Sequence, residues 1–343
     1  MAETKEKSRK RRIWLWIGLA IAVICLGALI GGGIAYVDHL LSAPNHLSRE
    51  DMPILDETDI SQIQEEPSAD WIEGGDLTFA ENLASDSHVM NIMLYGSDQR
   101  PNTGGQYGNA DAMVLLSIDT KHKKLKMTSF MRDLWVMVPG KREYRINTAY
   151  LLGGPRLSIE TVEKNFGIKI DKYAVVDFQT FPQIIDTLGG ITIDITQPEA
   201  DYLNALRLTT EFQPGPCHMD GEVALDYARA RKLKGDDFGR TQRHRTVLST
   251  VIKQFRSANL SQIASTLEQI MPMITTDLTK EERAQMLPNA MEYMRYDVVE
   301  YRLPQDGTFR YATYYYKDTP MNVLVIEDME QARKELRAFI YED

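Results

Sequence analysis

The sequence from Val89 to Asp133 contains three short apolar runs separated by turn-forming residues. The runs have the length of strands, and the breaks between them carry glycine, asparagine and charged residues, so the pattern predicts three successive antiparallel strands. In such an arrangement the first strand ends at Ser97, the second begins near Asp111 and the third ends at Met131. These three positions lie at one edge of the predicted sheet, which limits both the fold and the place of any site.

The same edge gathers charged residues of both signs. Two carboxylates that leave neighbouring strand ends can share a hard divalent cation, and two arginines beside them can hold an anion. A solvated edge whose aspartates only form turns is the alternative, and this stretch alone does not separate the two. The charged residues of the edge are Asp98, Arg100, Asp111, Arg132 and Asp133.

The N-terminal region has the pattern of a membrane anchor. Residues 1–12 carry six basic side chains, and residues 13–37 form an uncharged apolar run long enough to cross a bilayer as a helix. We expect an uncleaved transmembrane helix over 13–37, with residues 1–12 as a cytoplasmic tail and the remainder extracellular, because positive charge stays on the cytoplasmic side. A signal peptide cleaved near Ala43 is the alternative.

Residues 38–87 are strongly acidic, and Arg49 is the one basic residue among them. We interpret the segment as an extracellular linker, with a partner-binding tail as the alternative. The formal net charge of −10 argues against a general nucleic-acid binder, and because most of that charge lies in this segment, the folded domain is nearly neutral. Cys25 and Cys217 are too far apart in this topology to pair, and no structural zinc signature is present.

Beyond the predicted meander, strand and helix patterns alternate as far as Ile195. This order predicts an α/β fold, an α/β/α sandwich with a mixed central β-sheet, since crossover helices require parallel neighbours while the meander is antiparallel. Within it, residues 145–155 predict a short helix ended by Gly153 and Gly154. Residues 196–218 look irregular, and residues 259–343 are expected to form a helical extension that packs on the domain.

A second cluster of charge follows Asp220. The pattern predicts a short helix and then a longer one that begins at Asp236 or Asp237 and runs to about residue 258. Arginines bracket the start of the longer helix, and a helix N-terminus is itself a site for anions. The alternative is a solvated face on which they pair with neighbouring aspartates. The arginines are Arg229, Arg231, Arg240 and Arg243.

Together the two clusters indicate a site for a pyrophosphate held at a membrane surface. Arginine forks match phosphate oxygens, and a divalent cation neutralises charge as the bridging bond breaks. Phosphoryl transfer needs mainly positioning and charge stabilisation of this kind. Because ATP is scarce outside the membrane, a lipid-linked pyrophosphate is the more sensible donor.

Seven segments, in this order, make the chain resemble the LytR-CpsA-Psr family over residues 88–258. The segments are NIMLYGSDQR, NADAMVLLSID, SFMRD, RINTAYLLGGP, VVDFQTFPQIIDTLGGITI, DGEVALDYARAR and DDFGRTQRHR. The resemblance implies an enzyme of Gram-positive bacteria that attaches polyprenyl-pyrophosphate-linked glycopolymers, such as wall teichoic acid or capsular polysaccharide, to peptidoglycan. It also implies an apolar interior for the polyprenyl tail and Mg²⁺, or Mn²⁺ in its place, as cofactor.

The resemblance assigns roles by position. Asp98 and Asp111 match the metal carboxylates, Asp237 matches an acidic active-site residue that we take as the candidate base, and Asp133 is expected to orient Arg132. His244 stands where glutamine is usual, Met131 where proline is usual, and Lys232, Leu233 and Lys234 replace a more acidic connection. The residues matching the pyrophosphate-binding arginines are Arg100, Arg132, Arg229, Arg231 and Arg240, with Arg243 in support.

Three functions are therefore compared. The first is a magnesium-dependent glycopolymer phosphotransferase, with pyrophosphate hydrolysis as a side activity. The second is a non-catalytic regulator that binds polyprenyl pyrophosphate, and the third is a DNA-binding regulator. The expected topology disfavours the third, because it places the arginine-rich helix outside the membrane.

Overall fold

The computed structural model describes residues 38–39, 41–55, 77–98, 107–207, 210–230, 233, 236–257, 260–316 and 319–342. The chain divides into two compact units, residues 1–43 and residues 44–343, and the fold described below is that of the second. The predicted cytoplasmic tail and the predicted transmembrane helix, residues 1–12 and 13–37, lie outside the described residues. No helix in the described part of the chain combines the length and the apolar character needed to span a membrane.

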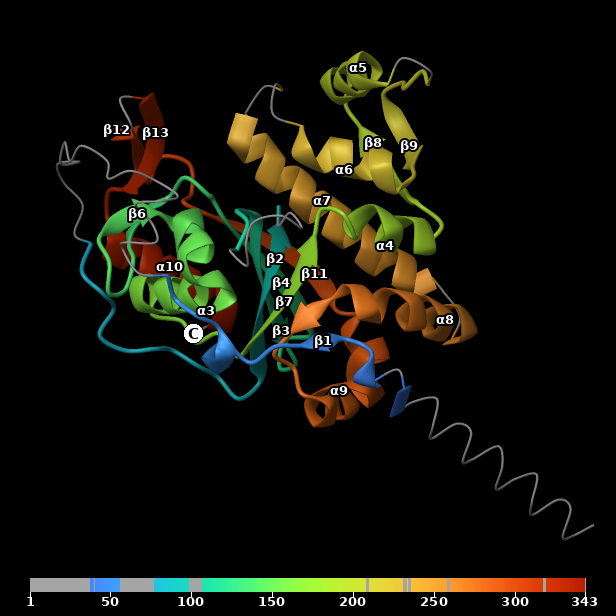
Figure 1. Ribbon diagram of the computed structural model, residues 1–343, viewed down its shortest axis with the longest axis horizontal. Helices are drawn as coiled ribbons and strands as arrows, with labels where there is room; N and C mark the ends of the chain where they lie inside the picture. Colours follow the sequence, from blue (N-terminus) through green and yellow to red (C-terminus); the bar gives the residue numbers. More distant parts are fainter. Residues whose placement is uncertain are drawn as a thin grey trace, which may run out of the picture. The chain divides into compact units, whose positions relative to one another are not determined.

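A seven-stranded mixed sheet forms the centre of the second unit (Figure 1). Its strands are β1 (Asn45–His46), β2 (Val89–Ser97), β3 (Ala110–Asp119), β4 (Lys124–Phe130), β7 (Lys172–Asp177), β10 (Thr275–Thr276) and β11 (Asp297–Leu303). Their order across the sheet is β1-β10-β7-β2-β3-β4-β11. Neighbours pair antiparallel in β2–β3, β3–β4 and β10–β7, and parallel in β1–β10, β2–β7 and β4–β11. The predicted mixed sheet is confirmed.

The predicted antiparallel meander is confirmed, with strand ends within one residue of those expected. Ser97, the last residue of β2, lies opposite Ala110, the first residue of β3. Val114 of β3 lies opposite Ser129 of β4. The end of β2, the beginning of β3 and the end of β4 therefore meet at one edge of the sheet.

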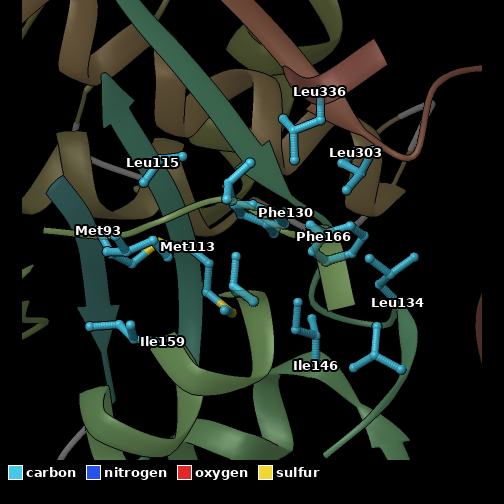
Figure 2. Close-up of a cluster of buried hydrophobic side chains, with 14 of the residues drawn as sticks. Met93, Met113, Leu115, Phe130, Leu134, Ile146, Ile159, Phe166, Leu303 and Leu336 are labelled. Atoms are coloured by element: carbon cyan, nitrogen blue, oxygen red, sulfur yellow. The ribbon is translucent and has the colours of Figure 1, made fainter. Parts of the chain in front are cut away.

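The strands of the sheet direct apolar side chains to both of its faces. Both faces must therefore be shielded from water, and helices cover each of them. On one face, the core joins the strands to α3 (Ile146–Phe166) and α10 (Met329–Tyr341). Figure 2 shows Met93, Met113 and Leu115 of the strands lying with Phe166 of α3 and Leu336 of α10 in this core.

The opposite face carries a second set of helices. Ile92 and Leu125 of the strands pack there with Ile252 and Met286, which lie on α7 and α9. The other helices of the described residues are α4 (Phe181–Thr187), α5 (Gln197–Leu206), α6 (Gly221–Arg229), α7 (Asp236–Ser257), α8 (Leu260–Ile270) and α9 (Lys280–Tyr293), with short 3₁₀ turns η1 (Arg49–Asp51) and η2 (Met271–Met273).

The predicted end of the first crossover helix at Gly153 and Gly154 appears as a break within α3. Both residues have non-helical backbone angles, and the helix resumes after them. Gly154 has φ +58°, and a Cβ there would lie 2.6 Å from the ring of Tyr107. Glycine is required at this position because it alone tolerates both the backbone angle and the close ring.

Three strand pairs lie outside the central sheet: β5 (Trp135–Met137) with β6 (Glu143–Arg145), β8 (Ile191–Ile195) with β9 (Gly215–Met219), and β12 (Phe309–Tyr316) with β13 (Thr319–Ile326). The interpretation of residues 196–218 as irregular is wrong, since they contain α5 and β9. Pro198 lies in the first turn of α5, where proline is tolerated, and Gly215 begins β9.

Two expected domain boundaries differ from the structure. Residues 259–343 are not a purely helical extension, because β10 and β11 belong to the central sheet. The acidic segment 38–87 is not only a spacer, since β1 pairs with β10 and Ala84 forms a bridge to Ile168. In both cases the partner strands lie far away in sequence, where local patterns give no indication of pairing.

A buried ion cluster fastens the C-terminal helix to the sheet. The ammonium of Lys126 lies 2.7 Å from Asp119 and 2.9 Å from Glu342, and it donates to the carbonyl of Ile340 at 2.7 Å. His122 also lies 2.7 Å from Asp119, so the group has the composition of a metal site, but the ammonium already occupies the position of a cation. Burial opposes the charge of Asp119, yet the hydrogen bond from Lys126 prevails and the pKa of Asp119 falls to about 2.

We predict that Lys126→Met lowers the free energy of unfolding by about 3–5 kcal/mol at neutral pH, because it leaves the Asp119 carboxylate buried without its cation. The folded pKa of Asp119 lies below the unfolded value of about 3.9. The contribution of the pair is therefore present above about pH 4 and is lost as the pH falls toward about 2. Urea unfolding of the two proteins at several pH values should show their difference shrinking over this range.

Lys124→Met is the matched control, since Lys124 also contacts Glu342 at 2.9 Å but is 36% exposed. Its loss should cost less than about 1 kcal/mol. Equal destabilisation by the two substitutions would contradict the assigned role of Lys126.

Candidate active site

The strand ends place the two predicted metal carboxylates on adjacent strands. Asp98 directly follows β2, and Asp111 is the second residue of β3. The backbone N–H of Asp98 donates to the carbonyl of Asn109 at 2.9 Å, which holds these two strand ends together. Several residues of the predicted site, Arg100, Arg231, Lys232 and Lys234, lie outside the described residues.

Arg132 lies at the centre of the site and contacts three carboxylates. Its guanidinium nitrogens lie 3.3 Å from Asp111, 3.2 Å from Asp133 and 3.4 Å from Asp237. Asp237 belongs to the first turn of α7 and lies 2.9 Å from Arg240, whose side chain is 2% exposed. The structure thus joins the two clusters that the sequence separates by about one hundred residues.

Charge and burial shift the titration of this group. Burial opposes the charge of Arg132, but Asp133, Asp237 and Asp111 outweigh it and raise the pKa of the guanidinium further. Burial is the largest cause that raises the pKa of Asp133, and the adjacent Asp237 carboxylate adds to this increase. Arg132 and Arg145 lower the pKa of Asp133, but they do not cancel the increase. Arg132 is therefore a permanent cation, and Asp133 is a carboxyl whose proton is held more tightly than usual.

Arg145 is a member of the site that the sequence analysis did not select. Its guanidinium lies 3.0 Å from the second oxygen of Asp133, so Asp133 bridges Arg132 and Arg145. Arg145 ends β6 and immediately precedes α3. It is the first residue of the RINTAYLLGGP segment, and this position in a family-like segment could have identified it as a candidate site residue.

Two further predicted arginines lie near the start of α7 but have different neighbours. The guanidinium of Arg229, at the end of α6, lies 5.0 Å from the centre of the Phe178 ring. Arg243 is buried, donates to the carbonyl of Ala230 and lies 3.8 Å from Glu199. Arg243 therefore secures the end of the helix that carries Arg229.

An apolar cavity of about 320 Å³ begins beside these charged groups. It lies between the sheet and helices α4, α6 and α7, and two of its lining residues neighbour the site directly: Ala112 follows Asp111, and His244 lies one helical turn after Arg240. Among the described residues of its lining, Arg229 is the one that carries a permanent charge. The lining residues are Leu94, Tyr95, Gly96, Ala112, Val114, Ala174, Val176, Phe178, Phe181, Ile184, Ile185, Leu225, Ala228, Arg229, His244, Val247, Leu248, Val251, Ile270 and Ile274.

His244 is held neutral at the boundary between cavity and charge. The residue is half-buried and belongs to the cavity lining. Burial lowers the pKa of its imidazole to about 3, and the positive charges of Arg240 and Arg243 add to this effect. The ring is thus an uncharged polar group at neutral pH, like the amide of the glutamine that the family resemblance leads one to expect here.

The arrangement suits a ligand with a polyanionic head and an apolar tail. Guanidinium groups can bind phosphate oxygens in pairs, and an apolar cavity of this size falls within the range of small-molecule sites. Asp98 and Asp111 offer hard oxygen ligands, and Mg²⁺ is commonly held by one or two carboxylates together with substrate phosphates. The residues present therefore fit a magnesium ion.

Comparison with known proteins agrees with the resemblance. The model of the LytR_cpsA_psr family matches residues 57–332. Polyisoprenyl-teichoic acid–peptidoglycan teichoic acid transferase TagU of Oceanobacillus iheyensis is 30% identical over 302 residues, which cover 83% of each chain. The corresponding transferase TagV of Bacillus subtilis is 36% identical over 184 residues, covering 51% of this chain and 46% of TagV.

Solved structures share the fold. The crystal structure of B. subtilis TagV superposes with a TM-score of 0.58 at 28% identity, over 75% of this chain and 98% of that one. The structure of TagT bound to LI-WTA gives a TM-score of 0.60 at 23% identity, over 77% of this chain and 96% of that one.

We predict that His244 makes the protein sensitive to mild acid. The unfolded chain takes up a proton at about pH 6.5, whereas folded His244 does so only at about pH 3. The unfolded state therefore binds more protons as the pH falls, and stability decreases. Between about pH 7 and pH 5 this one group should cost roughly 2 kcal/mol.

Urea unfolding of the wild type and of His244→Gln at both pH values measures the effect. The difference between the two proteins isolates His244 from the other histidines. His244→Gln should lose about 2 kcal/mol less than the wild type over this interval. An identical pH dependence would show that His244 titrates normally.

Proposed function

Because this chain belongs to the LytR_cpsA_psr family, we propose that it is a phosphotransferase that attaches a polyprenyl-pyrophosphate-linked glycopolymer to peptidoglycan. Relatives named as teichoic acid transferases favour a polymer of the wall teichoic acid type over a capsular polysaccharide. We further propose that the protein works at the outer face of the cell membrane, anchored by residues 13–37.

The observation that carries the proposal is the junction of the apolar cavity with the charged cluster. A polyprenyl pyrophosphate has an apolar tail and a doubly charged head joined directly, and it requires these two environments side by side. Ala112 and His244 line the cavity within one residue of Asp111 and one helical turn of Arg240. The cavity would receive the tail, while Arg132, Arg229 and Arg240 would hold the pyrophosphate.

On this proposal, phosphate oxygens would compete with carboxylates for the guanidinium groups of the site. Asp237 lies between Arg132 and Arg240, at 3.4 Å and 2.9 Å. When donor phosphates bind these two guanidinium groups, the ion pairs of Asp237 with them would weaken, and its carboxylate would become a better proton acceptor. This is the physical basis for Asp237 as the base, with Asp133 and Arg145 keeping Arg132 in position.

We propose the following reaction. The hydroxyl oxygen of a peptidoglycan sugar attacks the phosphorus that carries the polymer, and its proton passes to Asp237. The bond from that phosphorus to the bridging oxygen breaks, and polyprenyl phosphate leaves. A magnesium ion held by Asp98 and Asp111 would neutralise part of the charge on the pyrophosphate. Transfer of the same phosphorus to water would be the hydrolytic side reaction.

We predict that Arg132→Ala and Asp98→Ala each lower kcat/KM for transfer by at least about 10²-fold, because each removes charge compensation at the reacting phosphate. The assay uses the full chain in detergent micelles, a polyprenyl-pyrophosphate-linked oligosaccharide and peptidoglycan fragments, with and without Mg²⁺. It follows release of polyprenyl phosphate together with formation of the linked product. Removal of Mg²⁺ should have an effect similar to that of Asp98→Ala.

Two controls accompany this assay. Arg295→Ala removes an exposed arginine and should leave the rate unchanged, while Arg132→Lys keeps the charge but loses the fork and should remain impaired. Circular dichroism and thermal unfolding establish that the variants fold. If the wild type binds the donor but shows no turnover in the presence of acceptor, the proposed enzymatic function is contradicted. That result would favour the non-catalytic regulator.

We also predict that filling the cavity impairs the use of long-chain donors selectively. Ala174→Phe places a ring in the cavity lining and should raise the KM of a long polyprenyl donor about tenfold or more relative to a donor with a short prenyl chain. Ala205→Phe, which makes the same change at an exposed position, is the control. Equal effects on both donors would show that the tail does not enter this cavity.

A further inference from the structure

Three aromatic rings and one arginine form a patch beside the active site. The ring of Phe238 stacks on Phe309, with centroids 5.5 Å apart and planes at 28°, and Phe309 meets the ring of Tyr311 edge to face at 5.5 Å. The guanidinium of Arg302 lies 4.4 Å from the centre of the Phe238 ring. We refer to these four residues as the aromatic patch.

The backbone ties this patch directly to the charged cluster. Phe238 immediately follows Asp237, the candidate base. On the other side, the backbone N–H of Leu324 donates to the carbonyl of Asp133 at 2.9 Å. Leu324 lies opposite Tyr311 in the β12–β13 pair. Strand β13 therefore connects Tyr311 to Asp133. Figure 1 shows this strand pair in dark red.

The exposure of Tyr311 is not explained by packing of the hairpin. Along β12, the side chains of Ala312 and Tyr314 point to a core that contains Trp135, Val323 and Val325. Tyr311 alternates with them and lies on the other face, where its side chain is 64% exposed. It is the most exposed of the large hydrophobic side chains among the described residues. A large ring left in water next to two other rings indicates a contact surface.

We propose that the aromatic patch binds the glycan strand of the acceptor peptidoglycan, an inference that rests on the proposed transferase function. Pyranose rings have apolar faces of C–H groups and polar edges of hydroxyl and amide groups. The apolar faces pack on aromatic rings. The guanidinium of Arg302 donates to the carbonyl of Pro304 at 3.0 Å and to Asp306 at 2.5 Å, and its remaining N–H groups can hydrogen-bond to the polar edges. A polar yet partly apolar polymer fits this surface better than a lipid or a purely charged ligand.

The position of the patch also separates the two substrates. The cavity that receives the donor tail is lined by β2, β3, β7, α4, α6 and α7, and no residue of the aromatic patch belongs to its lining. The patch instead approaches the cluster from the ends of β11 and β12. A sugar bound on Tyr311 and Phe309 would therefore bring its hydroxyl to Asp237 from a side that the donor leaves open.

The test measures transfer by the full chain with soluble peptidoglycan glycan fragments as acceptor. Tyr311→Ala should raise the acceptor KM about tenfold, since truncating a central aromatic contact commonly costs at least that factor in affinity. Tyr311→Phe keeps the ring and should restore the acceptor KM to within about twofold of the wild type. Thr313→Ala, two residues along the same exposed face of β12, is the matched control and should have no effect.

The donor KM, measured in parallel, separates a loss of acceptor binding from a general defect. A rise confined to the acceptor KM supports the proposal. An unchanged acceptor KM in Tyr311→Ala overturns it, and so does an equal rise in the donor and acceptor KM values. If the wild type transfers nothing to peptidoglycan, the proposed function itself fails. To test the patch without turnover, titration of the glycan fragments into each protein measures binding directly, and equal affinities of wild type and Tyr311→Ala would again overturn it.

Discussion

The contact of one guanidinium group with three carboxylates holds the active site together. Arg132 reaches Asp111 at the start of β3, Asp133 beside it and Asp237 at the start of α7. Each partner comes from a segment that the fold must bring to the same edge of the sheet. Because a partly buried charge without a partner is very costly, these contacts also constrain where α7 begins relative to the meander.

The meander and most helices could be predicted from the sequence because their information is local. Strand length, turn residues and alternation place β2, β3 and β4 within one residue of their observed ends. The short turn between Asp119 and Lys124 sets the register of β3 with β4. The antiparallel order of three successive strands then brings Asp98, Asp111 and Arg132 to one edge without knowledge of distant segments. The start of α7 was predicted at Asp236 or Asp237 for the same reason, since aspartates favour helix N-termini, and the helix begins at Asp236.

Pairing between distant segments could not be predicted in this way. β11 completes the sheet by pairing with β4, which lies more than 160 residues earlier, and β1 pairs with β10 across an even longer separation. The hydrophobic pattern of such strands does not identify their partners. Arg145 was missed because its role depends on the β5–β6 turn, which carries it back to Asp133. The aromatic patch likewise combines residues from α7, β11 and β12, and no local pattern joins them.

In the absence of ligand, carboxylates stabilise the arginines of the site. If the proposed function is correct, the same carboxylates also couple the binding of metal to the binding of donor. A cation held by Asp111 would weaken the hold of that carboxylate on Arg132, and the guanidinium nitrogens would then be available to a phosphate oxygen. Conversely, a bound phosphate would offer oxygen ligands to a magnesium ion held by two carboxylates. Metal and donor should therefore bind more tightly together than separately, since each removes the interaction that competes with the other. His244 takes no part in this exchange of charges because its ring stays neutral, so it can contact the boundary between tail and head group without adding repulsion toward Arg240.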